Sequence, residues 1–348
     1  MIVLDGSQIR QLVDVEHVYR AYRDALRDRE ARFRGSLSWK TVRGHDYLYQ
    51  KRSGLAKSLG PRSPETERIF DQFRTGRAES RKRVETLDKR LREMAPVNRA
   101  MRLGRVPVMS ARVIRRLDGL GLIGQGLRVA GTHALYAYES LAAVHFDNQH
   151  VATQDIDLLY DARSTIRLVG QGEAGLIGQL QSLDRTFRLT EPGSFRAVND
   201  DGFMVDLITP LPRNPGMAPA SRGLGGAEDV RAVEIAGLRW LENSRPVDRI
   251  VLDERGYPLR IVAPDPRAFA VHKSWVAGRD DRDPGKRRRD LAQARAVASI
   301  LAHQLPELRF DDPALQYLPA DLRKTGEALT AEVVARRFRP TLDDEDWV

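Results

Sequence analysis

The chain has 348 residues, with 57 Lys+Arg against 48 Asp+Glu and a formal net charge of +9. Its hydrophobic content of 41% supports a packed core, and its length allows two or three domains or one large one. It contains no cysteine, which excludes disulfides, thiolate metal sites and a cysteine nucleophile.

The charge and the apolar pattern bear on partners and location. A basic balance suits a polyanionic partner, although an arginine-rich composition without functional meaning explains it equally well. No apolar stretch approaches the roughly 20 residues of a membrane span. The N-terminus also lacks the basic-then-apolar order of a signal peptide. We therefore expect a soluble, cytoplasmic protein without a membrane partner.

Residues 1–103 are expected to form a separate module of helix, β-hairpin and helix. Helical periodicity with dense charge covers 9–32 and 65–94, and strand-like residues with a turn near Arg43 cover 37–50. Basic and aromatic residues alternate there: Trp39, Lys40, Arg43, Tyr47, Tyr49, Lys51, Arg52 and Lys57. This composition fits a nucleic-acid surface, but a hairpin packed by its aromatic residues with a solvated charged face is the commoner arrangement.

Residues 104–265 carry the elements of a mixed sheet. A helix is expected over 110–120, and strands over 127–130, 155–160, 194–198 and 203–208, with a hairpin turn over 199–202. Strands over 232–235 and 259–262 are expected to extend the same sheet. The Gly- and Pro-rich stretch 209–226 predicts a long loop, either a gate for substrate or a plain connector.

Two acids lie within one predicted strand. Asp155 and Asp157 are two residues apart, so their side chains point to the same face of the sheet. Neighbouring carboxylates repel, and a divalent cation such as Mg²⁺ or Mn²⁺ relieves that repulsion with hard oxygen ligands. An isolated Asp-x-Asp is common in acidic loops, so this pair needs support from other residues.

Two further features supply that support. Gly131 and Thr132 form a turn between a predicted strand and helix, where a glycine lets the backbone approach a ligand and helix N–H groups bind anions. Asp206 is a lone acid in a strand that should be buried, which is costly unless it is paired or bound to a cation. A salt bridge from Asp206 to an arginine is the alternative.

In chain order, this Gly-Thr turn, Asp-x-Asp strand and single Asp resemble the DNA polymerase beta-like nucleotidyltransferase superfamily. The chain looks most similar to uncharacterised bacterial proteins of nucleotidyltransferase fold. This similarity extends to short sequence motifs at 38–40, 47–49 and 57–66. It is more loosely similar to abortive-infection nucleotidyltransferase toxins, which share the Thr-x-Asp-Ile-Asp motif at 153–157. The gap between turn and acids is longer here than in short members, and Thr132 replaces the commoner Ser or Gly.

The resemblance implies an α/β fold, with a nucleotidyltransferase-type mixed sheet core, the N-terminal module and a C-terminal helical segment over 266–348. It assigns the nucleotide phosphates to Gly131 and Thr132. It assigns paired metal ions to Asp155 and Asp157, with Asp206 completing the metal site and helping to deprotonate the attacking hydroxyl.

Helices are expected over 267–276 and 286–301. By the same resemblance, Lys273 contacts the triphosphate and Lys286 is the second choice, although a lysine on an amphipathic helix is usually only solvated. His133, beside the turn, either contacts the nucleotide or caps the helix within the core. Trp240 and Trp275 are expected to pack in the core or to stack on a base.

The expected function is metal-dependent transfer of a nucleoside monophosphate from an NTP to an acceptor hydroxyl, with release of pyrophosphate. The acceptor is RNA such as tRNA, a protein or a small molecule. One alternative is a non-catalytic nucleic-acid-binding or regulatory protein on the same fold. Another is a toxin or defence component controlled by an antitoxin-like protein partner.

Overall fold

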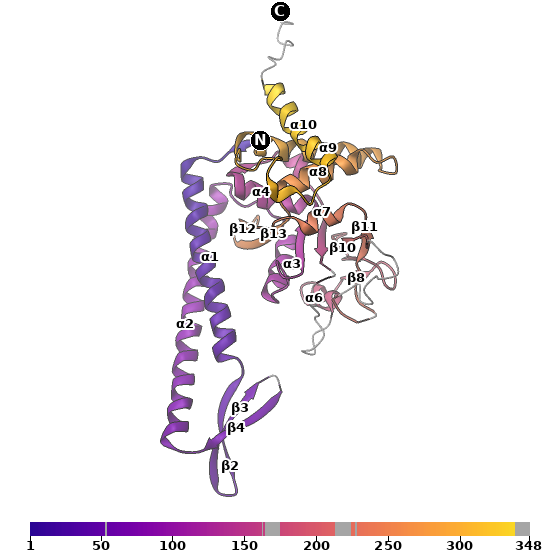
Figure 1. Cartoon of the computed structure of the whole chain (residues 1–348). Helices are drawn as coiled ribbons and strands as arrows, with labels where there is room; N and C mark the ends of the chain where they lie inside the picture. Colours follow the sequence, from indigo (N-terminus) through magenta and orange to yellow (C-terminus); the bar gives the residue numbers. More distant parts are fainter. Residues whose placement is uncertain (53, 162, 164–174, 213–223, 227, 338–348) are drawn as a thin grey trace, which may run out of the picture. The chain divides into compact units, whose positions relative to one another are not determined.

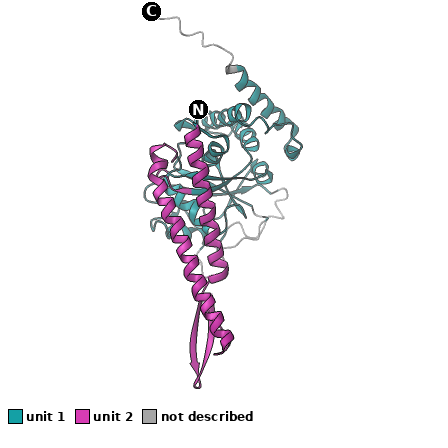
Figure 2. Ribbon diagram, turned by 90° about the vertical axis from the view of Figure 1, so that its left-hand side faces the viewer, with its two compact units in different colours: residues 1–5, 105–253, 259–348 teal, residues 6–104, 254–258 magenta. Residues whose placement is uncertain are grey.

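The computed structural model describes residues 1–52, 54–161, 163, 175–212, 224–226 and 228–337. Its contacts divide the chain into two units, coloured separately in Figure 2. The first unit comprises residues 1–5, 105–253 and 259–348, and the second comprises residues 6–104 and 254–258. Figure 1 labels the elements in chain order. The C-terminal helices thus belong to the same unit as the main sheet.

The second unit consists of two long helices and a small sheet. The helices are α1 (Gly6–Phe33) and α2 (Pro64–Ala100), and the antiparallel strands between them are β2 (Ser36–Val42), β3 (His45–Arg52) and β4 (Leu55–Pro61). Ser63 caps α2 in a reciprocal capping box with Thr66. At the tip of β2 and β3, Arg43 and Gly44 have φ of 52° and 82°, which suits a tight hairpin turn.

The two predicted helices and the β2–β3 hairpin are confirmed, but the hairpin prediction was incomplete. β4 adds a third strand, paired with β3 from Leu55 to Pro61. Its glycine and proline argue against a strand in the sequence. An edge strand tolerates both, because one side of its backbone needs no partner.

The main sheet of the first unit has the order β5-β7-β10-β9-β8, with β11 also beside β10. Its strands are β5 (Leu127–Ala130), β7 (Asp155–Tyr160), β8 (Arg188–Leu189), β9 (Arg196–Val198), β10 (Met204–Pro210) and β11 (Val233–Ile235). β10 runs parallel to β7 and β11 and antiparallel to β9, while β5 is antiparallel to β7. The mixed sheet of the predicted α/β core is therefore confirmed.

Four more strands form two separate pairs. β12 (Val247–Leu252) pairs with β13 (Pro258–Ala263), and β1 (Ile2–Val3) pairs with β6 (Val144–His145). The prediction that 259–262 extends the main sheet was wrong, because that strand pairs with β12. Arg260 on β13 binds Asp248 on β12, with Nη2 to Oδ2 at 2.8 Å. The predicted loop over 209–226 lies mostly outside the described residues, and Thr209 and Pro210 end β10.

Helices cover the sheet and complete the first unit. The helical segments are α3 (Val108–Gly119), η1 (Gly131–His133), α4 (Ala134–Ala142), α5 (Asn148–Val151), α6 (Leu176–Gln181), α7 (Leu238–Asn243), α8 (Pro266–Ala277), α9 (Pro284–His303), η3 (Pro313–Leu315) and α10 (Ala320–Arg337). Asp265 and Asp283 cap α8 and α9, each followed by a proline in the first turn. Within the described ranges, no helix combines the length and the apolar character that crossing a membrane requires.

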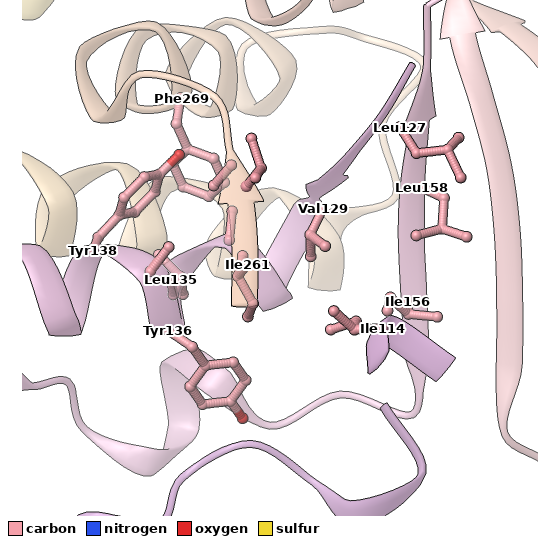
Figure 3. Close-up of a cluster of buried hydrophobic side chains, with 14 of the residues drawn as sticks. Ile114, Leu127, Val129, Leu135, Tyr136, Tyr138, Ile156, Leu158, Ile261 and Phe269 are labelled. Atoms are coloured by element: carbon pink, nitrogen blue, oxygen red, sulfur yellow. The ribbon is translucent and has the colours of Figure 1, made fainter. Parts of the chain in front are cut away.

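The core of the first unit lies between these helices and the strands. Figure 3 shows side chains of α3, α4 and α8 gathered with those of β5, β7 and β13. Tyr138 and Phe269 are fully buried, and their rings meet edge to face with centroids 5.3 Å apart. The packing fixes α4 and α8 against the strands whose ends carry the predicted acids.

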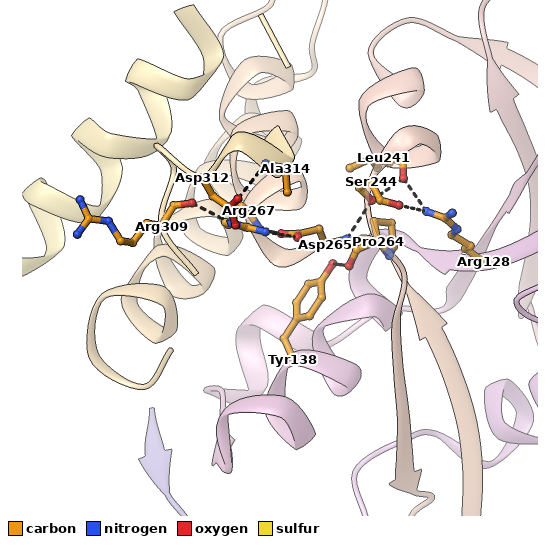
Figure 4. A network of polar contacts seen from close by, with 10 residues as sticks. All are labelled: Arg128, Tyr138, Leu241, Ser244, Pro264, Asp265, Arg267, Arg309, Asp312 and Ala314. Atoms are coloured by element: carbon orange, nitrogen blue, oxygen red, sulfur yellow. Dashed lines mark hydrogen bonds and ion pairs between the residues drawn. The ribbon is translucent and has the colours of Figure 1, made fainter. Parts of the chain in front are cut away.

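A buried polar network fixes the start of α8 (Figure 4). Arg267 is 3% exposed and donates to both oxygens of Asp265, at 3.1 and 2.8 Å. It also donates to Asp312 and to the Arg309 carbonyl, each at 2.9 Å. The Tyr138 hydroxyl donates to the Pro264 carbonyl at 3.0 Å, which ties α4 to the same junction.

We predict that Arg267→Ala lowers the free energy of unfolding by about 3–5 kcal/mol, because it leaves the Asp265 carboxylate buried without its partner. Arg267→Lys should recover only part of the loss, since an ammonium group cannot reproduce the two-pronged contact. Urea denaturation measures both. Arg309→Ala is the matched control, because the exposed Arg309 side chain pairs with exposed Asp311 and its loss should cost under about 1 kcal/mol. Equal losses in Arg267→Ala and the control would contradict the prediction.

Candidate active site

The three predicted acids lie on one face of the main sheet. In the parallel β7–β10 pair, Asp157 is opposite Asp206, so both side chains point to the same side. Asp155 is two residues before Asp157 and shares that side, opposite Met204. Ile156, between them, is fully buried on the other face. The pairing thus brings together acids that are about 50 positions apart in the sequence.

The predicted phosphate turn lies directly against Asp157. Ala130, the last residue of β5, is opposite Asp157 in the antiparallel β5–β7 pair, and Gly131 follows it with φ of 54°. A Cβ atom on Gly131 would collide with the Asp157 carboxylate. Only glycine fits both the left-handed conformation and this close approach. The long gap between turn and acids is filled by α4, β6 and α5, which leave the sheet and return to it.

Two threonine hydroxyls connect the turn and the acid strand to α9. The buried Thr132 hydroxyl accepts hydrogen bonds from Arg289 Nη2 at 2.6 Å and from Gln293 Nε2 at 3.1 Å. Arg289 also donates to the Thr153 hydroxyl at 3.3 Å, and that hydroxyl donates to the Asp155 carboxylate. Arg289 therefore links both halves of the predicted site.

Asp206 is paired with an arginine. Arg196 on β9 is its antiparallel partner and donates from Nε to Oδ1 at 2.7 Å and from Nη2 to Oδ2 at 2.6 Å. The salt bridge left open as an alternative is thus present, in addition to the register with Asp157. Within the described part of the chain, no three His, Cys, Asp or Glu side chains lie close enough together to hold a metal ion.

Asp157 is held without such compensation. Within the described ranges its carboxylate makes no hydrogen bond or ion pair, although its backbone pairs with both neighbouring strands. Burial raises its pKa to about 6, the charges of Asp155 and Asp206 add to the rise, and those of Lys273 and Arg196 oppose it. Hard carboxylate oxygens whose repulsion is incompletely relieved are a donor set that fits a divalent cation at Asp155 and Asp157. Asp206 fits only after Arg196 releases it.

The two candidate lysines differ in position. The charge of Lys273 on α8 lowers the pKa of Asp157, against the larger effect of burial. Its Nζ is 2.7 Å from Oδ1 of the buried Asp290, whose other oxygen accepts from Arg282 at 2.8 Å. Lys286 is exposed in the first turn of α9. Of the two lysines, Lys273 is the one whose charge opposes the raised pKa of Asp157.

His133 and the two tryptophans have the environment of core residues. His133 is fully buried, its Nε2 is 2.7 Å from the Ser110 hydroxyl, and burial lowers its pKa to about 4. It is therefore neutral at pH 7. Trp240 and Trp275 meet edge to face with centroids 5.1 Å apart and pack against the main core.

Sequence reasoning missed the roles of Arg196, Arg289 and Gln293. Arg196 was within reach, because counting back from the turn at Asn199 pairs Val198 with Met204 and Arg196 with Asp206. Arg289 and Gln293 are one helical turn apart, but their spacing alone does not say which face of α9 meets the sheet.

A family model described as nucleotidyltransferase matches residues 108–318. The matched span begins at the first residue of α3 and ends just after η3, so it contains the Gly131 turn, the three acids and both candidate lysines. No curated protein and no solved structure matches the chain.

We predict that the raised pKa of Asp157 makes the protein less stable as the pH rises from about 4 to 6. Between these pH values the folded protein keeps the proton on Asp157, whereas the unfolded chain has released it. The resulting stabilisation is complete below the pKa of Asp157 in the unfolded chain. It is lost as the pH rises through the higher pKa of the folded state. The loss should be about 2 kcal/mol. Asp157→Asn, which cannot ionise, should remove that slope in urea denaturation at stepped pH.

Asp201→Asn is the control, because this exposed acid lies in the turn after β9 and should leave the slope unchanged. Parallel pH profiles for the wild type and Asp157→Asn would show that Asp157 does not titrate as the structure indicates.

Proposed function

The chain belongs to the nucleotidyltransferase family whose model it matches, and we propose that it transfers a nucleoside monophosphate from an NTP to an acceptor hydroxyl. The observation that carries the proposal is the contact of the Gly131 turn with Asp157, with Asp206 opposite Asp157 in register. A backbone that approaches closely without a side chain suits phosphate, and the adjacent carboxylates suit a cation. The two requirements of nucleotidyl transfer thus meet at one point of the sheet.

In this proposal, Asp155 and Asp157 hold Mg²⁺ or Mn²⁺, and Asp206 joins them once Arg196 has released it. Such an ion offsets the charge of the phosphates and polarises the phosphorus under attack. The carboxylate chemistry and the incompletely relieved repulsion at Asp157 support the assignment.

The residues of the chain supply positioning and charge. Gly131 and the N–H groups at the start of η1 face the phosphates, while Lys273 and Arg289 contribute positive charge. The acceptor oxygen bonds to the α-phosphorus and the bond to the bridging oxygen breaks. Pyrophosphate leaves with that electron pair, and Asp206 takes the proton of the hydroxyl. Release of Asp206 from Arg196 is a requirement of this scheme.

The acceptor is RNA such as tRNA, a protein or a small molecule, and the positive charge of the chain favours a nucleic acid. Control by an antitoxin-like partner rests on the resemblance to abortive-infection toxins alone. In that case, activity would appear or disappear with a second protein. Co-expression with any small neighbouring reading frame separates this case.

A second candidate is a non-catalytic nucleic-acid-binding or regulatory protein on the same fold. The observation in its favour is Arg196, which occupies both oxygens of Asp206. A guanidinium there neutralises the acid permanently if no ligand displaces it. Against it stands Asp157, whose pKa is raised by burial and further by the charges of Asp155 and Asp206, without any benefit to an inactive protein.

We predict that the wild-type protein transfers label from at least one α-³²P NTP to an acceptor, in the presence of Mg²⁺ or Mn²⁺. Total cellular RNA and protein serve as acceptors. Asp155→Ala/Asp157→Ala should reduce transfer by at least about 10³-fold, since removing preorganised charge stabilisation typically costs 10²–10³ per group.

A thermal shift on adding Mg²⁺ or Mn²⁺ is the second readout. It should occur in the wild type and be absent from the double variant, because binding to the folded state alone stabilises it. If no label moves but the shift is present, a partner is missing. If neither occurs with any nucleotide, the non-catalytic candidate is the better account.

We also predict that Lys273→Ala raises the KM for the NTP by at least about tenfold, because it removes a cation near the phosphates. Lys286→Ala is the matched control, since its exposed side chain should change KM less than about twofold. Melting curves check that Asp290, which loses its partner in Lys273→Ala, does not unfold α9. A larger effect from Lys286→Ala would reverse the assignment of the two lysines.

A further inference from the structure

The positive charge of the chain is concentrated in the N-terminal unit. Residues 6–104 and 254–258 carry 25 Lys+Arg against 14 Asp+Glu, a net charge of +11, whereas the whole chain has +9. The remainder of the chain is therefore slightly acidic. Almost all of this unit lies outside the span of residues 108–318 that matches the nucleotidyltransferase family.

On the two long helices, acids nearby neutralise many of the basic side chains. Pairs one helical turn apart recur along α1 and α2, such as Arg20 with Glu16 and Arg81 with Glu85, at 2.7 Å each. These exposed pairs are the ordinary pattern of a solvated helix. Together, α1 and α2 carry 16 Lys+Arg against 12 Asp+Glu, a net charge of +4 spread over 65 residues.

The small sheet is different. Five exposed basic residues lie on its strands and turns, and none forms an ion pair with an acid in the described ranges: Lys40, Arg43, Lys51, Arg52 and Lys57. Asp46, the one acid of its strands, accepts hydrogen bonds from Thr41 at 2.6 Å and from Arg62 at 3.3 Å. The sheet and its turns, residues 36–61, thus carry a net charge of +4 over 26 residues, a higher density than on the two helices.

The strand register sorts the sheet residues into two faces. Trp39 is opposite the buried Leu48, and its ring lies 5.8 Å from that of Phe70 on α2, so this face packs on the helix. On the other face, Lys40 is opposite Tyr47, and Tyr49 follows Tyr47 by two residues. We define this second side as the outer face of the sheet.

The outer face combines aromatic rings with cations. Tyr47 and Tyr49 are each partly exposed, and Lys40 Nζ is 5.0 Å from the Tyr49 ring centroid. Lys51, two residues after Tyr49, lies on the same face and is exposed. Two rings two residues apart on a strand are separated by about 7 Å. Successive bases of an extended single strand can stack on rings at that spacing while lysines contact the phosphates.

We propose that the outer face of this sheet binds a single strand of nucleic acid, with RNA as the acceptor of the transfer. The acceptor role rests on the proposed function, whereas the binding itself does not. A duplex keeps its bases stacked on one another, so these rings cannot reach them. An acidic protein surface would use the lysines but would leave the partly exposed tyrosine faces without a role.

The test is fluorescence anisotropy of a fluorescein-labelled 20-nucleotide RNA of mixed sequence, titrated with the full chain without nucleotide. Tyr47→Ala/Tyr49→Ala and Lys40→Ala/Lys51→Ala should each weaken binding at least about tenfold. Only the lysine variant should reduce the slope of affinity against salt, because it alone removes phosphate contacts. Tyr47→Phe/Tyr49→Phe, which keeps the rings, should bind like the wild type.

Arg81→Ala/Lys89→Ala is the matched control. It removes the same number of charges from exposed α2 positions that pair with Glu85 and Glu93, so binding should weaken less than about threefold. Circular dichroism checks that every variant keeps its helices. Equal weakening in all variants would overturn the proposal, since net charge alone would then account for binding. Undetectable RNA binding by the wild type would overturn it as well.

Single-stranded DNA and duplex RNA of the same sequence form the other arms. Tighter binding of the duplex would overturn the single-strand assignment, and equal binding of DNA would overturn the assignment to RNA. A parallel assay of nucleotidyl transfer to the labelled RNA distinguishes the binding proposal from the catalytic proposal. Sheet variants that lose RNA binding but keep transfer would refute the acceptor role alone, whereas RNA binding without transfer in the wild type would refute only the catalytic proposal.

Discussion

The parallel pairing of β7 with β10 is the constraint on which the candidate site depends. Every residue of β10 after Met204 is buried, so the apolar pattern alone does not fix its register. A slip by one residue would turn Asp206 into the apolar layer on the opposite face, where an unpaired carboxylate is costly. The two-pronged contact with Arg196 removes that freedom, because it requires β9 and β10 to pair as they do.

The same arginine, Arg196, binds the Asp206 carboxylate that the proposed metal site also requires. Arg196 balances Asp206 while its own side chain stays 34% exposed, so it has a route to solvent. Asp157, one strand away, has no such partner among the described residues and keeps a raised pKa. In the proposed scheme, a divalent cation would replace the Arg196 guanidinium as the positive partner of Asp206. At Asp157, it would supply a positive partner where the structure has none among the described residues. The two acids thus differ in how far their negative charge is compensated.

The sequence predicted the elements that depend on local pattern and missed those that depend on pairing. Apolar runs and helical periodicity located the strands β5, β7, β9, β10 and β11 and the helices α3, α8 and α9, but not the two-residue strand β8. The strand at 259–262 was assigned to the wrong sheet, because nothing in its composition distinguishes β12 from the main sheet as a partner. Strand β4 was not predicted, because its glycine and proline are tolerated only in a strand at the edge of a sheet. Of the site, the acids and the glycine turn could be found, whereas the contacts of α9 required the fold.

Charge is divided between the two units in a way that bears on how an acceptor would be chosen. The cations of the candidate site are largely compensated, since Lys273 and Arg282 share Asp290, and Arg196 binds Asp206. A slightly acidic unit of this kind offers a nucleotide local contacts but exerts no long-range attraction on a polyanion. Long-range attraction of any polyanion therefore has to originate in the N-terminal unit, where the excess charge lies. Almost all of that unit lies outside the span that matches the family, so the charge that would attract a polyanionic acceptor is separate in the sequence from the three acids.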